Sequence, residues 1–285
     1  MSIQKPKLIT ILGPTASGKS DLAVKLAKEF NGEIISADSR QIYKEMNIGT
    51  GKITKKEMKG IKHYLLDIAT PKKQITITEF KEKAEKAIKE IYKKNKIPIL
   101  CGGTGFYIQA ITENIIIPRV KPDKNLRKEL EKKTIKQLFE QLKKLDPKRS
   151  KSIDSKNKRR LIRALEILIK TKKPIPKLKK DSQFNNLYIG IKKENINELI
   201  NKRVDKMIKQ GLKKEVKALF KKYGKTQVLK NTIGYQEFQE LNPIDKIKLH
   251  TRQFSKRQMT WFKKNPDIRW IKDYNEAKKI VKDFL

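Results

Sequence analysis

Short apolar runs alternate with amphipathic stretches along the first third of the chain. Four runs rich in β-branched residues predict strands, at residues 7–12, 33–37, 63–68 and 97–100. Apolar residues recur at helical spacing over 21–30 and 78–92, and a threonine cap is expected to open the second of these helices. Apolar strands that alternate with helices are typical of a parallel sheet covered on both faces. This part of the sequence therefore predicts an α/β fold.

The pattern changes in the middle of the chain. Helical spacing alone is found there, with charged helices predicted over 126–145 and 158–170. A strand returns at 187–191, and the remainder is mostly helical with an edge strand expected at 269–271. We therefore expect three segments: 1–118 as the first part of the α/β core, 119–186 as an all-helical insertion, and 187–285 as the second part of the core.

A glycine-rich motif follows the first predicted strand and fits the pattern G-x-x-x-x-G-K-[ST]. Its residues are Gly13, Pro14, Thr15, Ala16, Ser17, Gly18, Lys19 and Ser20. Glycines allow successive backbone N–H groups to curl around a phosphate, and the helix that follows presents its positive end. Lys19 adds a point charge, and the hydroxyl of Ser20 can hold Mg²⁺. The motif predicts a P-loop NTPase-like sheet that binds a di- or triphosphate, so ATP is one expected ligand.

Polar residues also follow the second and fourth predicted strands. Asp38, Ser39, Arg40 and Gln41 end the second strand, and Thr104 follows the fourth. In an open α/β sheet, ligands bind outside the carboxyl ends of the strands, so Asp38 and Thr104 are expected to face the bound phosphates. Asp38 then suits a general base or a Mg²⁺ ligand, although an isolated aspartate at a strand end is also typical of a helix cap or a turn.

These motifs by themselves leave several activities open. A small-molecule kinase would carry the same loop and add an arginine-rich lid, and an NTP hydrolase would have an apolar strand that ends in an acidic metal ligand. A non-catalytic RNA-binding protein could use the loop as a nucleotide switch. Transfer of phosphate from ATP without any need for RNA would identify a kinase, and activity without Asp38 would identify a switch.

Nine sequence blocks together resemble the bacterial tRNA dimethylallyltransferases (tRNA isopentenyltransferases). They occur in that family's order and cover nearly the whole length, at 13–20, 36–43, 48–50, 102–107, 146–147, 159–166, 203–212, 233–237 and 251–262. The resemblance implies transfer of a dimethylallyl group from dimethylallyl diphosphate to the exocyclic amine (N6) of an adenosine in tRNA. That adenosine lies immediately 3′ of the anticodon (position 37), and Mg²⁺ is the implied cofactor.

The resemblance also implies roles for individual residues. Asp38 would accept the proton of the adenine amine, Thr104 would lie near the bridging oxygen of the diphosphate, and Arg203 would be a second cation on that diphosphate. The target base must be turned out of the RNA loop into a pocket, which Asp38–Gln41 and Thr104 would line. Further residues would contact the anticodon arm: Arg127, Arg159, Arg160, Leu161, Ile162, Arg163, Arg252, Lys256 and Arg257. Near Arg252, the aromatic residues Phe254 and Trp261 suit base contact alongside these cations, or burial in the core of an amphipathic helix with the arginines outward.

Composition adds less than these motifs. The 285 residues carry 70 Lys and Arg against 31 Asp and Glu, a net charge of +39, with 37% apolar residues. This charge fits a nucleic-acid partner, but lysine is spread along the whole chain, so compositional bias explains it equally well. The single cysteine, Cys101, excludes a disulfide framework and is expected to be an inert core residue. We see no signal peptide or membrane span and expect a cytoplasmic monomer.

Overall fold

The computed structural model describes residues 5–116, 118, 120–175 and 182–285. The chain divides into two compact units, one made of Met1–Asn114 with Asp181–Leu285 and the other of Ile115–Lys180. Residue 119, where we expected the helical insertion to begin, lies outside the described residues. We call the first unit the core unit and the second the insertion unit, and each is described by itself.

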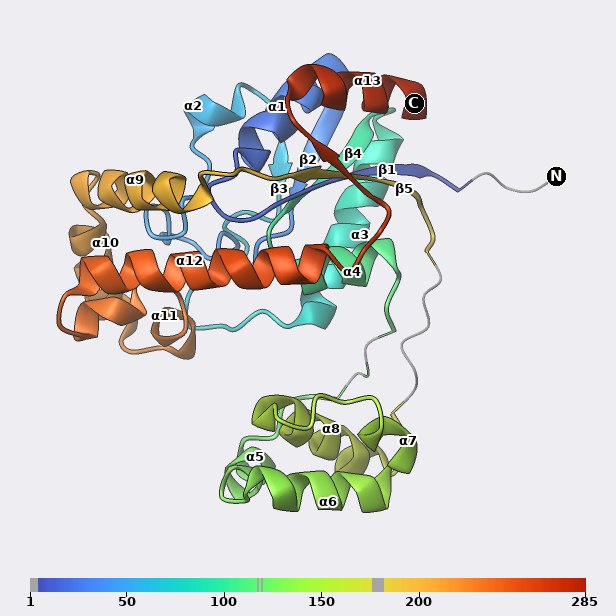
Figure 1. The fold of residues 1–285 in the computed structure, drawn as a ribbon, viewed down its shortest axis with the longest axis vertical. Helices are drawn as coiled ribbons and strands as arrows, with labels where there is room; N and C mark the ends of the chain where they lie inside the picture. The colour runs from blue at the N-terminus through green and yellow to red at the C-terminus, as the bar shows by residue number, and fades with distance from the viewer. Residues whose placement is uncertain (1–4, 117, 119, 176–181) are drawn as a thin grey trace. The chain divides into compact units, whose positions relative to one another are not determined.

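The core unit contains a six-stranded sheet in which every pairing is parallel (Figure 1). Its spatial order is β3-β2-β4-β1-β5-β6. The strands are β1 (Lys7–Leu12), β2 (Gly32–Ser36), β3 (His63–Tyr64), β4 (Ile97–Gly102), β5 (Asn185–Ile191) and β6 (Ile268–Ile271). The predicted P-loop-like α/β fold is therefore confirmed, with β6 as the expected edge strand.

One strand is shorter than its apolar run predicted. We expected residues 63–68 to be extended, but β3 contains only His63 and Tyr64. Leu65 (φ 66°) and Asp67 (φ 56°) both adopt left-handed backbone conformations, which no strand accommodates. The apolar run therefore continues as a turn that leads Leu66 toward the carboxyl edge of the sheet.

Helices cover both faces of the sheet. Helix α1 (Lys19–Glu29) and helix α13 (Tyr274–Phe284) pack on one face, where Leu26 and Val281 are fully buried. On the other face, α3 (Ile77–Lys93) and α4 (Gly105–Thr112) pack on the strands. Helices α9 (Ile196–Lys209), α10 (Leu212–Tyr223) and α12 (Pro243–Phe262) pack on one another and belong to the same hydrophobic cluster. Short helices α2 (Lys55–Met58), α11 (Gln227–Lys230) and η1 (Gln236–Gln239) lie in the connections. Apolar strands thus bury both faces, as their continuous hydrophobic runs predict.

Local sequence explains where α3 begins. The side chain of Thr76 accepts a hydrogen bond from the backbone of Glu79, and the Glu79 side chain bonds back to Thr76. This capping box supplies a threonine cap, but at Thr76, so the helix begins at Ile77 and not at Thr78 as the sequence predicted. Phe80, Ala84 and Ile91 then follow on one buried face.

The regular elements in the described part of the insertion unit are all helices. It contains α5 (Lys124–Glu131), α6 (Ile135–Leu145), α7 (Pro147–Ser150) and α8 (Lys158–Thr171) around a small core that includes Leu138, Leu142 and Leu165. We expected one helix over 126–145, but the structure has two. Thr134 forms a capping box with Gln137, so a second helix begins there and the expected single helix is divided in two.

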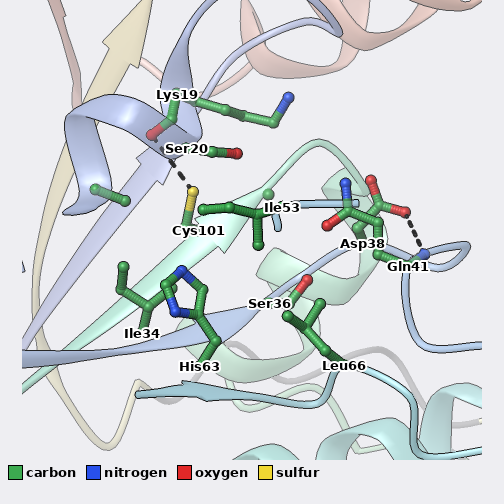
Figure 2. Close-up of a pocket in the computed structure, with 12 residues that line it drawn as sticks. Lys19, Ser20, Ile34, Ser36, Asp38, Gln41, Ile53, His63, Leu66 and Cys101 are labelled. Carbon is green, nitrogen blue, oxygen red and sulfur yellow. Dashed lines mark hydrogen bonds between the residues drawn. The ribbon is translucent and has the colours of Figure 1, made fainter. Parts of the chain in front are cut away.

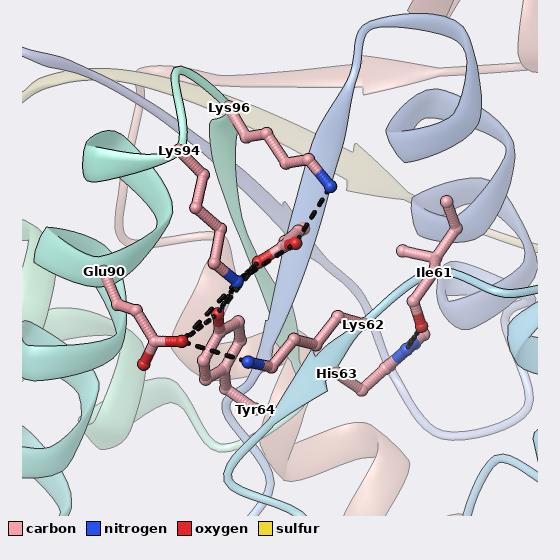
Figure 3. A network of polar contacts seen from close by, with 8 residues as sticks. Ile61, Lys62, His63, Tyr64, Glu90, Lys94 and Lys96 are labelled. Atoms are coloured by element: carbon pink, nitrogen blue, oxygen red, sulfur yellow. Dashed lines mark hydrogen bonds and ion pairs between the residues drawn. The ribbon is translucent and has the colours of Figure 1, made fainter.

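A buried carboxylate stabilises the edge of the sheet opposite the carboxyl ends of the strands (Figure 3). Glu33 on β2 accepts hydrogen bonds from Lys94 (3.0 Å), Lys96 (3.0 Å) and the Tyr64 hydroxyl (2.8 Å). Figure 3 labels these three partners. Burial raises the pKa of Glu33, but the bonds from the two lysines and Tyr64 outweigh burial and lower it to about 2. The folded state therefore favours the ionised form of Glu33.

We expect Glu33→Gln to destabilise the protein at neutral pH by about 2 kcal/mol, a value that allows for solvent screening of the lysines. The stabilisation of the folded state by ionised Glu33 is present above the unfolded-state pKa of about 4.5 and is lost as pH falls toward 2. Urea unfolding of both proteins between pH 3 and pH 7 measures it. Glu29→Gln, which removes an exposed pair with Lys278, is the control and should change stability little. If the free energies of unfolding of wild type and Glu33→Gln differ by the same amount at pH 3 and at pH 7, this explanation is wrong.

Candidate active site

The P-loop connects β1 to α1 and has an unusual backbone. Ala16 adopts a left-handed conformation (φ 64°), which is costly for a residue with a side chain and is typical of functional loops. Gly13 has no room for a side chain, because a Cβ there would lie 2.8 Å from the carbonyl oxygen of Ile191 and 2.9 Å from Ser17 Oγ. The loop therefore depends on glycine at the position where the motif has it.

Two features of this loop suit an anion. The N-cap residue of helix α1 is Gly18, which has no side chain to cap the first N–H groups of the helix. Ser17 Oγ is buried and has no hydrogen-bond partner in the described chain. Uncapped N–H groups at a helix N-terminus and a buried hydroxyl without a partner are the donors that a phosphate satisfies.

Two cations lie beside the loop. Lys19 Nζ donates to the carbonyl oxygen of Pro14 (3.2 Å), and Arg203 Nη2 on α9 donates to the carbonyls of Thr50 and Gly51 (both 3.4 Å). Burial lowers the pKa of each side chain, Arg203 lowers the pKa of Lys19 further, and Asp38 opposes both shifts. Both cations are thus partly buried, with carbonyl oxygens as their hydrogen-bond partners in the described chain, and a polyanion between them would stabilise both.

The strand-end residues meet as the sheet topology predicts. Asp38 Oδ1 accepts from the backbone N–H of Arg40 (2.8 Å) and of Gln41 (3.3 Å), so this carboxylate does form the turn that we considered as its alternative role. Its Oδ2 makes no hydrogen bond within the described residues. Thr104 Oγ1 accepts from the backbone of Ser39 (3.0 Å) and does not cap its own helix, α4. One carboxylate oxygen therefore fixes the side chain, and the other is free for chemistry.

Figure 2 shows a pocket at this carboxyl edge of the sheet. Its polar lining is Lys19, Ser20, Ser36, Asp38, Gln41 and His63, and its apolar lining is Ala23, Ile34, Ile53, Leu66 and Cys101. The sequence did not indicate His63 as a lining residue. Burial lowers the pKa of His63, and the hydrogen bond between its Nδ1 and the Ile61 carbonyl (2.9 Å) opposes part of that shift. Burial also raises the pKa of Cys101 to about 12, so its thiol is inert at neutral pH.

The pocket has donors that suit magnesium. Ser20 and Asp38 supply oxygen atoms, which are the ligands that Mg²⁺ prefers. In the described part of the chain, no group of three or more His, Cys, Asp or Glu residues is arranged to hold a metal. A magnesium ion here would therefore take its other ligands from water and a bound diphosphate.

Gln258 on α12 is a site residue that the sequence did not reveal. Its Oε1 accepts from the backbone N–H of Thr15 (2.9 Å), and its Nε2 donates to the carbonyl of Gly103 (2.8 Å). It therefore joins the P-loop to the loop that carries Thr104. The available signal was its position three residues after Ser255 and four before Phe262, the buried face of α12.

The residues expected to contact RNA in the insertion unit differ in exposure. Arg159 and Arg160 are exposed at the start of α8. Leu161 and Ile162 are 0% and 4% exposed, so their side chains pack in the core of this unit, and their expected contact with RNA stays a prediction. Arg127 and Arg163 differ from these residues, because both bind a buried carboxylate.

Arg127 and Arg163 both bind Glu166, which is 0% exposed. Arg127 Nε donates to Glu166 Oε1 (2.8 Å) and its Nη2 donates to Oε2 (2.7 Å). A buried carboxylate needs such partners, so these arginines stabilise the insertion unit whatever else they contact.

Helix α12 carries the other basic residues expected to contact RNA. Arg252 donates to Asn201 Oδ1 (2.8 Å), whereas Lys256 and Arg257 are exposed. Phe254 and Trp261 are both 36% exposed, so of the two roles considered for them the structure does not support burial in the core. The buried face of α12 is formed instead by smaller or polar residues, Ser255 and Gln258 among them, together with Ile247 and Phe262.

Comparison with known proteins gives a consistent result. The sequence profile of the IPP transferase family matches residues 41–265. The tRNA dimethylallyltransferase of Halothermothrix orenii is 42% identical over 306 residues, which cover 98% of this chain and 93% of that protein. That of Staphylococcus epidermidis (strain RP62A) is 42% identical over 288 residues, which cover 94% of this chain and 87% of that protein.

Two solved structures are similar over nearly the whole chain. The tRNA isopentenylpyrophosphate transferase from Staphylococcus epidermidis has a TM-score of 0.73 and 38% identity, covering 99% of this chain and 100% of that one. A eukaryotic dimethylallyltransferase described as acting on tRNA has a TM-score of 0.82 and 29% identity, covering 93% of this chain and 73% of that one. No helix in the described part of this chain is long and apolar enough to cross a membrane.

The P-loop geometry predicts that Lys19→Ala will weaken binding of inorganic pyrophosphate with Mg²⁺ by about 10- to 100-fold, because it removes a charge-assisted contact. Titration calorimetry measures this affinity. Lys25→Ala, on an exposed position of the same helix, is the matched control and should bind normally. Equal affinities for wild type and Lys19→Ala would mean that the loop does not hold diphosphate.

Proposed function

Because the chain belongs to the IPP transferase family, we propose that it transfers a dimethylallyl group from dimethylallyl diphosphate to N6 of the adenosine immediately 3′ of the anticodon in tRNA. Diphosphate is released. The observation that carries this proposal is the pair of partly buried cations, Lys19 and Arg203, beside a carboxylate with one unused oxygen. The cations suit a diphosphate leaving group, and the carboxylate suits a proton acceptor.

The diphosphate would bind in the P-loop. Uncapped N–H groups of α1 and the Ser17 hydroxyl would donate to its oxygens, with Lys19 on one side and Arg203 on the other. Negative charge develops on the leaving oxygen as the C–O bond breaks, and fixed cations stabilise that charge more than they stabilise the bound substrate. Mg²⁺ held by Ser20 and the diphosphate would supply further neutralisation of this charge.

The five-carbon group and the adenine would occupy the pocket beside the loop. Ile34, Ile53 and Leu66 offer an apolar wall, which suits a hydrocarbon chain. The adenine amine attacks the carbon that bears the leaving oxygen, so an N–C bond forms as the C–O bond breaks. The amine then loses a proton, which Asp38 Oδ2 would accept because Oδ1 is held by the backbone of Arg40 and Gln41. Thr104, fixed to Ser39, would lie near the bridging oxygen.

Both units would contribute to tRNA binding. Each unit has exposed cations that would contact phosphates. They are Arg159 and Arg160 on the insertion unit, and Lys256 and Arg257 on α12 of the core unit. Arg257 also lies over the ring of Phe254 (5.9 Å to its centroid), and exposed cations beside exposed aromatic rings are typical of surfaces that bind single-stranded nucleic acid.

Asp38→Asn should lower the rate of prenyl transfer by about 100-fold or more, because the amide cannot accept the proton. Its Oδ1 can still accept from Arg40, so binding of tRNA and of pyrophosphate should stay within about threefold of wild type. Mass spectrometry of the anticodon-loop nucleosides measures the product, and Asp21→Asn on the exposed face of α1 is the control. If the wild-type protein consumes ATP and the adenosine gains no five-carbon group, the proposed function is wrong.

Affinity for tRNA should fall steeply as salt rises, because phosphate contacts release counter-ions. Arg159→Ala and Arg160→Ala should each reduce the slope of log K against log salt by about 1. Filter binding between 50 and 200 mM salt tests this, at roughly the range where such slopes are large. Lys279→Ala, exposed on α13, is the control. If the affinity for tRNA does not change with salt, the excess positive charge reflects compositional bias and not RNA binding.

A further inference from the structure

A loop of the core unit, residues 47–51, lies between the site and helix α10. Glu215 on α10 accepts hydrogen bonds from three consecutive backbone N–H groups, those of Asn47 (3.1 Å), Ile48 (2.8 Å) and Gly49 (3.0 Å). A carboxylate that accepts several backbone N–H groups holds a loop much more firmly than one neutral hydrogen bond does.

Tyr235 contacts both Glu215 and the 47–51 loop. It is 0% exposed, and its hydroxyl donates to Glu215 Oε1 (2.7 Å). Burial raises the pKa of Tyr235, so the hydroxyl remains a donor at neutral pH. A Cβ at Gly49 would lie 2.5 Å from the tyrosine ring, so the loop backbone rests directly on that ring. Glu215 and Tyr235 thus fix the loop by bonding and by contact.

The other side of the same loop holds two site residues. The carbonyls of Thr50 and Gly51 accept from Arg203 Nη2 (both 3.4 Å) and from Gln41 Nε2 (3.5 and 3.3 Å). Gly51 has φ +57°, and a Cβ there would lie 1.8 Å from Arg203 Nη2. The guanidinium therefore lies against the loop backbone, and a displaced loop would displace it.

We propose that Glu215 is a positioning residue for the transfer reaction: it holds the 47–51 loop so that the carbonyls of Thr50 and Gly51 aim Arg203 and Gln41 into the site. This inference rests on the proposed function. Glu215 reaches Arg203 through the loop, because its hydrogen bonds in the described chain go to the N–H groups of residues 47–49 and to the Tyr235 hydroxyl, and none goes to Arg203.

The first test compares Glu215→Gln and Tyr235→Phe with wild type. Glutamine keeps the shape of the side chain but replaces one acceptor oxygen with an NH₂ group, which cannot accept from the loop. We expect Glu215→Gln to raise KM for dimethylallyl diphosphate about tenfold and to lower kcat, because a misplaced cation stabilises the leaving group poorly. Tyr235→Phe should change the same parameters by about threefold, because it removes one of four bonds to the carboxylate.

Affinity for tRNA should stay within about twofold in both variants, because it depends mainly on phosphate contacts elsewhere. Glu45→Gln is the matched control. Glu45 binds Lys222 (2.8 Å) and Tyr223 (2.7 Å) at the other end of α10, without any hydrogen bond to the 47–51 loop. Its kinetics should match wild type. A loss in thermal stability for Glu215→Gln with unchanged KM and kcat would show a merely structural role and overturn the proposal.

A double-mutant cycle with Arg203→Ala tests the route of the effect. If Glu215 acts through Arg203, Glu215→Gln should weaken pyrophosphate binding about tenfold in the wild-type background and less than twofold when Arg203 is already absent. An equal effect in both backgrounds would overturn the proposal. Titration with inorganic pyrophosphate and Mg²⁺ measures binding and does not depend on prenyl transfer. The double-mutant cycle therefore tests the role of Glu215 even if the wild-type protein transfers no prenyl group and the proposed function fails. If Glu215→Gln does not fold, Tyr235→Phe carries the same cycle.

Discussion

The site is organised around a repulsion that the protein does not neutralise by itself. Lys19 and Arg203 lie near enough to lower the pKa of Lys19, and their hydrogen bonds within the described chain go to carbonyl oxygens. Asp38 and Glu57 offset part of this repulsion, but within the described chain neither carboxylate forms an ion pair with Lys19 or Arg203. A bound diphosphate would balance them, and its charge is also what must be stabilised when it leaves. Ligand binding and leaving-group stabilisation therefore use the same groups.

Holding these cations in place requires a rigid backbone, and buried polar side chains provide it. Gln258 joins the P-loop to the loop of Thr104, and Glu215 with Tyr235 holds the loop that contacts Arg203. In each case a side chain from the second half of the chain bonds to backbone groups in the first half. The parallel sheet brings the strand ends together, but these bonds determine the spacing between the loops that follow the strands.

The large positive charge has more than one use. Glu33 and Glu166 show that part of it stabilises buried carboxylates, with Lys94 and Lys96 in the core unit and Arg127 and Arg163 in the insertion unit. Other cations, such as Arg159 and Arg160, are exposed and suit phosphate contacts. Net charge therefore overstates the surface available to RNA.

The sequence by itself determined the fold class, the P-loop and the strand ends that carry Asp38 and Thr104, because hydrophobic periodicity and a glycine-rich motif are local signals. It also placed Arg203 by family resemblance. It did not reveal Gln258 or Glu215, because a glutamine or glutamate on a helix is ordinarily solvated, and only packing shows that these two are bonded to distant backbone. Nor could periodicity show that Phe254 and Trp261 are exposed, whereas the burial of Leu161 and Ile162 does follow the apolar face of their helix. Tertiary structure decided these points because burial and hydrogen-bond partners depend on segments far apart in the chain.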